Sequence, residues 1–125
     1  MPADEAEAHE AITAAFTRVF GAQFERDAKL ANIDDPSGLD ALFDEVDSRY
    51  PQAAETAKVV IERVVFNAPD DASVVYQVAY EGAAPFDRKV GKARRTAEGW
   101  KVTRETVCEL FAFAGAPCVT PDPAG

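Results

Sequence analysis

The pattern of apolar positions divides the chain into a helical first part and a β-rich second part. In the first part, apolar residues recur every three or four positions, as they do along one face of a helix. This spacing predicts a long helix over residues 4–24. It also predicts a second helix that starts near Leu39 and ends at Tyr50, because the residue before a proline avoids the helical region.

From about position 57 onward, apolar and polar residues alternate, as they do along half-buried strands. The predicted strands are residues 58–66, 73–81, 86–96 and 100–104. In the first strand the alternation slips between Ile61 and Val64, which indicates a bulge. After position 105, helical spacing returns and predicts a short C-terminal helix with Gly115 as its cap.

Helices followed by an antiparallel meander predict an α+β fold. We expect the N-terminal helices to pack on a curved antiparallel four-stranded sheet that wraps round the first helix. Residues 1–118 should form one domain, because a chain of 125 residues has the size of a single domain. The small, proline-rich segment 119–125 is predicted to be a disordered tail.

The net charge of −9 is uneven, because basic residues gather in 88–104, where Glu98 is the only acid. An acidic chain with one short basic band does not predict nucleic-acid binding. The acidic N-terminus is unlike a signal peptide, and no apolar run reaches the roughly 20 residues that span a bilayer. We therefore expect no membrane insertion by this segment, which is either a whole protein or a domain of a longer one.

Cys108 and Cys118 are the two cysteines of the chain. Two cysteines ten positions apart in a small domain favour a disulfide that pins the C-terminal helix to the sheet. The alternative is a pair of reduced, buried thiols. The first case indicates an extracytoplasmic protein and the second a cytoplasmic one.

The basic band places Arg88, Lys92 and Arg94 on one face of a predicted strand. These three residues are candidates for binding an anionic ligand or an acidic partner. The alternative is a solvated sheet face whose charges lie across from Glu62 and Glu81 on neighbouring strands.

Aromatic residues are the candidates for a pocket. Tyr76 and Tyr80 share one face of the second predicted strand, and Tyr50 could join them at the mouth of the curved sheet. If that face is concave, their hydroxyls would be polar points in an apolar pocket, as a ligand site requires. Phe16 and Phe20, on the first predicted helix, face the same space or the core.

Catalytic groups are scarce in the sequence. His9 is the only histidine, and a histidine in the first turns of a helix is more often exposed than catalytic. An enzyme would need a buried carboxylate, for which Glu62, Glu81 and Glu105 are the candidates near the strands. No metal-ligand set and no phosphate-binding loop is present, so we predict neither a metal nor a cofactor.

The order of helix, short helix, helix and curved sheet resembles the nuclear transport factor 2-like superfamily (SnoaL-like, with a cystatin-like cone). Within it, the sequence G-W-K-V-T-R-E-T-V-C at 99–108 is similar to the C-terminal domain of the mycobacterial low-molecular-weight antigen type. The segments 29–33 and Gly38-Leu39 also resemble that domain, and the likeness covers roughly residues 8–118. The resemblance implies an actinobacterial, exported or anchored protein with a pocket at the open end of the cone, and no catalytic set.

Together these observations predict a non-enzymatic domain that binds a small apolar ligand or a protein partner. A homodimer that forms through the convex sheet face is a further expectation. The alternative is a cone-fold isomerase, cyclase or hydrolase that acts on an apolar small molecule.

Overall fold

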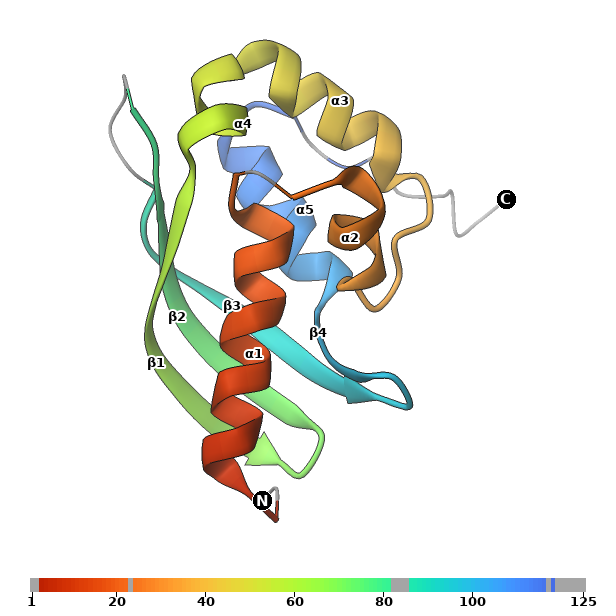
Figure 1. Ribbon diagram of the computed structural model, residues 1–125, viewed down its shortest axis with the longest axis vertical. Helices are drawn as coiled ribbons and strands as arrows, with labels where there is room; N and C mark the ends of the chain where they lie inside the picture. Colours follow the sequence, from red (N-terminus) through yellow and green to blue (C-terminus); the bar gives the residue numbers. More distant parts are fainter. Residues whose placement is uncertain (1–2, 23, 82–85, 117, 119–125) are drawn as a thin grey trace.

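The computed structural model describes residues 3–22, 24–81, 86–116 and 118, with the backbone alone at 86 and 87. Its helices are α1 (Glu5–Phe20), α2 (Arg26–Ala31), α3 (Leu39–Arg49), α4 (Pro51–Thr56) and α5 (Arg104–Phe113). Its strands are β1 (Lys58–Ala68), β2 (Asp71–Ala79), β3 (Phe86–Thr96) and β4 (Gly99–Val102). This α+β arrangement, shown in Figure 1, confirms the predicted fold class. The predicted tail, 119–125, lies outside the described residues.

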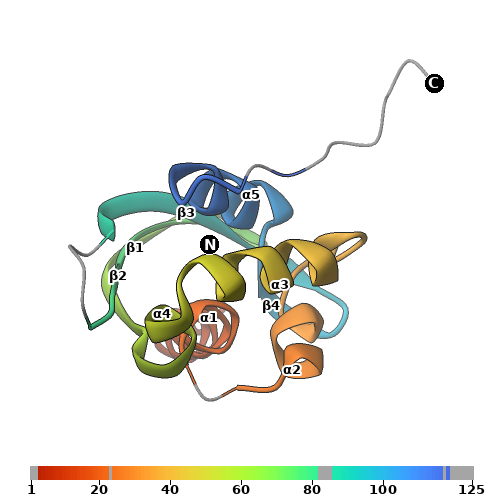
Figure 2. The same ribbon diagram turned by 90° about the horizontal axis from the view of Figure 1, so that it is seen from above.

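The four strands form one antiparallel sheet in the order β1-β2-β3-β4, which curves around α1 (Figure 2). Ile61 pairs with Tyr76 and Arg63 with Val75, so Glu62 is the extra residue of a bulge at the predicted place. A second irregularity lies between Phe66 and Ala68, and a third in β3, where Arg88 adopts a φ of 43°. Bulges bend the strands that carry them, and together they help the sheet to wrap.

The alternation along β2 decides which face of the sheet is concave. Ala72, Val74, Tyr76 and Val78 are all buried, while the residues between them are half-buried. Tyr76 packs against Phe16 and Phe20 of α1, with ring centroids 5.1 Å and 5.5 Å apart. The face that carries Tyr76 is therefore the concave one, and α1 lies in it.

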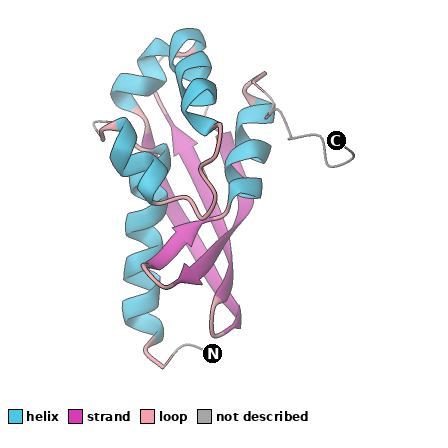
Figure 3. Ribbon diagram, turned by 90° about the vertical axis from the view of Figure 1, so that its right-hand side faces the viewer, coloured by secondary structure: helices cyan, strands magenta, loops and turns pink. Residues whose placement is uncertain are grey.

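The first helix ends earlier than the spacing predicts. α1 stops at Phe20 because Gly21 turns to extended backbone, where its N–H donates to the Thr17 carbonyl at 2.8 Å. α2 and α4 did not stand out in the hydrophobic pattern because neither contains a buried residue. Pro51 opens α4, where its missing N–H costs nothing. Figure 3 shows these short helices gathered at one end of the molecule.

Two threonines hold α5 against β3. Thr103 caps the helix, and its hydroxyl lies 2.7 Å from that of Thr106. The Thr106 hydroxyl also accepts the backbone N–H of Lys92 at 2.8 Å. Gly91 makes this approach possible, because a Cβ there would overlap Thr106 Cγ2 and lie 3.1 Å from Tyr76 Cε1. The start of α5 is thus bonded directly to the sheet.

A disulfide joins the middle of α5 to the segment that follows the helix, and not to the sheet as expected from the sequence. Cys108 and Cys118 form a disulfide, as predicted, with their Cα atoms 5.3 Å apart. Gly115 has a φ of 84°, and its N–H donates to the Ala112 carbonyl while that of Ala116 donates to Phe111. These two bonds are the Schellman arrangement, which confirms the predicted glycine cap.

The segment between α2 and α3 covers the outer edge of β4. Ile33 forms a parallel bridge with Val102, and Asp34 accepts the backbone N–H of Arg104 at 2.8 Å. The Arg104 guanidinium donates to the carbonyls of Asp35 and Ser37. Among the described helices, none combines the length and the apolar character that a bilayer span requires.

We expect Gly91→Ala to lower the free energy of unfolding by about 2 kcal/mol, because the added methyl pushes α5 away from β3. Urea unfolding measures this loss. Thr106→Ser removes the overlapping methyl but keeps the hydroxyl, so it should recover part of the loss in the Gly91→Ala background. Additive effects of the two changes would contradict the proposed contact.

Replacing both cysteines with serine should lower the free energy of unfolding by about 3 kcal/mol, since the disulfide closes a short loop in the unfolded chain. Thermal unfolding with and without a thiol reductant provides the control. Reductant should bring the unmodified protein to the stability of the double variant and leave the variant unchanged. Equal stability of the unmodified protein and the double variant in the absence of reductant would count against this role.

Candidate functional site

A cavity of about 180 Å³ lies at the end of the molecule where the short helices gather. It lies between the C-terminal end of α1, the helices α2 to α5 and the end of β2. Most of its walls are apolar. The apolar residues that line it are Val19, Phe20, Phe24, Phe43, Val46, Ala53, Ala54, Ala57, Val78, Leu110, Phe111 and Ala114. A few polar side chains interrupt them, which is the composition of a small-molecule site.

Two tyrosines close one side of the cavity. The rings of Tyr50 and Tyr80 meet edge to face, with centroids 6.2 Å apart. The Tyr50 hydroxyl donates to the Ala114 carbonyl at 2.8 Å, which ties the junction of α3 and α4 to the end of α5. Burial raises the pKa of the Tyr80 hydroxyl. The two tyrosines therefore contribute ring surface to this side of the cavity.

The predicted pocket residues separate into two groups. Tyr50, Tyr80 and Phe20 line the cavity. Phe16 and Tyr76 do not, because they lie deeper in the core, with exposed fractions of 0% and 2%. Burial accordingly raises the pKa of the Tyr76 hydroxyl.

Lys29 provides the most unusual polar group of the cavity. Its side chain reaches from α2 to the end of α1, where Nζ donates to the carbonyls of Val19 at 3.0 Å and Gly21 at 2.7 Å. A cation at the C-terminus of a helix is favourable, because the last carbonyls have no partner within the helix. Nζ also lies 5.8 Å from the centre of the Phe43 ring. Burial lowers the pKa of Lys29 to about 8.

Arg26 is held by the acidic face of α3. Its guanidinium lies 2.8 Å from Asp40, 2.9 Å from Asp44 and 3.1 Å from Asp47. The guanidinium carbon also lies 5.3 Å from the centre of the Phe43 ring. These contacts fix α2 against α3 and engage the positive charge of Arg26 within the protein.

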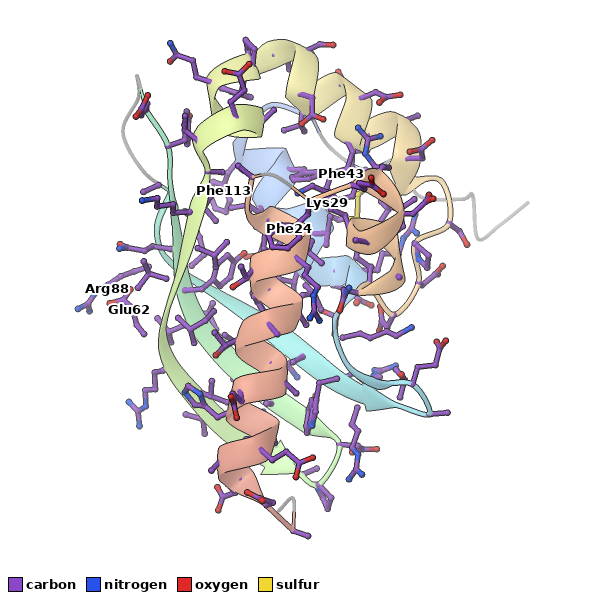
Figure 4. All side chains as sticks on the ribbon, viewed as in Figure 1. Phe24, Lys29, Phe43, Glu62, Arg88 and Phe113 are labelled. Atoms are coloured by element: carbon purple, nitrogen blue, oxygen red, sulfur yellow. A yellow bond between two sulfur atoms is a disulfide. The ribbon has the colours of Figure 1, made fainter. Side chains whose placement is uncertain are left out.

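Figure 4 shows Phe24, Lys29 and Phe43 close together beside the upper end of α1. The hydrophobic pattern missed Lys29 and Arg26 because α2 buries no residue. One signal was present: aspartates at 40, 44 and 47 recur at helical spacing, and two cations three positions apart precede them. Such a pattern indicates a charged contact between two helices but does not reveal the cavity behind it.

The basic residues Arg88, Lys92 and Arg94 lie on the outer face of the sheet, away from the cavity. Their side chains are exposed, and each has a carboxylate 3.8 to 3.9 Å away, on Glu62, Asp71 and Asp34 respectively. Figure 4 shows Arg88 and Glu62 pointing outward together. The same face exposes Val60, Val65 and Val90.

The groups considered for catalysis lie apart from the cavity. His9 is exposed on α1 and does not line it. Glu62, Glu81 and Glu105 are all exposed to solvent. Among the residues that the structure describes, no group of three His, Cys, Asp or Glu side chains could hold a metal ion.

The chain matches a known protein family. No curated protein matches the chain. A family model does match, over residues 5–118, which includes every helix and strand described above and both cysteines. Its description is low molecular weight antigen MTB12, C-terminal domain. The chain therefore belongs to the family of the MTB12 low molecular weight antigen C-terminal domain.

Proposed function

We propose that this domain is a non-enzymatic binding domain that holds a small apolar molecule in the cavity at the open end of its cone. The observation that carries the proposal is the cavity itself, with its aromatic and aliphatic walls and few polar groups. The curved sheet around α1 also supports a place in the nuclear transport factor 2-like superfamily, whose cone has its pocket at this end.

The family and the disulfide support an exported or anchored protein. Disulfides persist in oxidising compartments and are rare in the cytosol of ordinary cells. The Cys108–Cys118 bond closes a loop that contains the cavity-lining residues Leu110, Phe111 and Ala114. An oxidising compartment would thus keep one wall of the cavity in place.

The carboxylates considered for catalysis do not support the enzymatic alternative. A cone-fold isomerase or cyclase needs a carboxylate inside the pocket to move a proton. The three glutamates considered for that role are exposed, and the carboxylate that does line the cavity, Asp47, is bonded to Arg26. Binding is therefore the function that this site supports best.

We expect toluene to bind saturably and to shift the methyl NMR signals of Val78 and Leu110, which line the cavity. Phe24→Ala should weaken the binding about fivefold, because it removes one aromatic wall. Phe113→Ala is the matched control, since Phe113 is an exposed phenylalanine outside the cavity. Absence of saturable shifts, or equal weakening by both variants, would overturn the proposal.

A second candidate function is self-association through the outer sheet face. The specific observation is that Val90 is 61% exposed and Val60 45% exposed on that face. Exposed apolar side chains that lie together are typical of contact surfaces. The neighbouring cations would face their copies across such a dimer, so salt should strengthen it by screening their repulsion.

Light scattering after size exclusion tests this candidate at low and at high salt. We expect a dimer fraction that rises with salt and disappears in Val90→Lys, which adds a further cation in the centre of the contact. Phe113→Lys, at an exposed position on α5, should leave the dimer fraction unchanged. A monomer at 100 μM under both salt conditions would rule the dimer out.

A further inference from the structure

The wall of the cavity is mostly apolar, but α2 places the Lys29 ammonium in it. This combination suggests which class of ligand the cavity takes. We propose that the cavity takes a small organic acid with one aromatic ring or a comparably short acyl body, whose carboxylate pairs with the Lys29 ammonium. This inference rests on the proposed function, because it names the class of molecule that would occupy the same cavity.

The size of the cavity limits the apolar part of the ligand. A buried apolar cavity of roughly 150 Å³ accommodates benzene. The cavity here measures about 180 Å³, which leaves room for one ring and a small polar substituent. Phe20, Phe43 and Phe111 supply the aromatic surface for such a ring.

Lys29 is placed to meet the polar substituent. An ammonium has three N–H donors, and two of those of Lys29 bond to the carbonyls of Val19 and Gly21. Within the described part of the chain, the third has no hydrogen-bond acceptor. Since Lys29 is itself part of the cavity wall, an acceptor on the ligand can complete its hydrogen bonding.

The other polar groups of the cavity wall are less suited to bind an acid. Arg26 on α2 is bonded to the three aspartates of α3. Asp47 would repel a carboxylate, but its charge is paired with Arg26. Tyr50 already donates to the Ala114 carbonyl. A ligand carboxylate is therefore best placed next to Lys29, with its ring toward α5 and β2.

The electrostatic surroundings of Lys29 predict that the affinity of the cavity for an acid depends on pH. The pKa of Lys29 is lowered to about 8, chiefly by burial; the charge of Asp47 opposes this shift and that of Arg26 adds to it. Tyr50 and Tyr80 are the remaining titratable groups of the wall, and burial raises the pKa of Tyr80. A bound carboxylate favours the charged amine, so the affinity for an acid should fall once the pH exceeds the pKa of the free amine.

Calorimetric titration with benzoate, benzamide and toluene tests the inference on the unmodified protein. Benzoate and benzamide have nearly the same shape, but only benzoate is charged. At pH 7 we expect benzoate to bind about tenfold more tightly than benzamide, as a charge-assisted hydrogen bond allows. Between pH 7 and pH 9 the affinity for benzoate should fall about tenfold, while that for benzamide and toluene stays constant.

A pair of lysine variants locates the effect. Lys29→Met keeps an apolar side chain of similar length and should abolish both the preference for benzoate and its pH dependence. Lys92→Met is the matched control on the outer face of the sheet and should change neither. If Lys29→Met fails to fold, the ligand series and the pH series on the unmodified protein still decide the question.

The outcomes separate this inference from the proposed function. Equal binding of all three probes, or a benzoate affinity that is independent of pH, would overturn the acid assignment and leave a neutral apolar pocket. Loss of the benzoate preference in Lys92→Met would move the anion site to the outer face and also overturn it. Failure of all three probes to bind would overturn both proposals.

Discussion

The close contact between α5 and β3 is the constraint on which the rest of the molecule depends. Gly91 has no side chain, so the Thr106 hydroxyl can accept a hydrogen bond from the backbone of the strand. This contact positions the first turn of α5, and the disulfide ties the segment after the helix back to it. The apolar face of α5 then closes the cone over Phe20 and Phe43. Without this helix, the cavity would be open on one side.

The open end of the cone combines two physical requirements in one place. A helix that ends inside a domain leaves carbonyls without partners, and burying them without partners is costly. Lys29 satisfies two of these groups at the end of α1, which brings a partly desolvated amine to an apolar cavity. A structural need of the fold has thereby produced the kind of polar point that ligand recognition uses.

The sequence predicted the sheet better than the site, for reasons that particular residues make clear. The alternation from Val74 to Val78 follows directly from burial of one face of β2, and the slip near Glu62 from a bulge. The hydrophobic pattern did not locate the two short helices, because it detects only helices that bury residues, and neither α2 nor α4 buries any. Lys29 escaped for a related reason: the groups it bonds to are backbone carbonyls, which leave no trace in a sequence.

The segment that joins α2 to α3 has a consequence for how the sheet can grow. Ile33 and Asp34 occupy the free side of β4, so no further strand can be added there. The opposite edge is β1, which is bent by its bulge and carries the exposed charges of Lys58 and Arg63. Bulges and charges on an edge strand discourage pairing with other chains. The molecule thus protects its two sheet edges by different means, one by coverage and the other by charge, and β1 is the edge at which strand addition would have to occur.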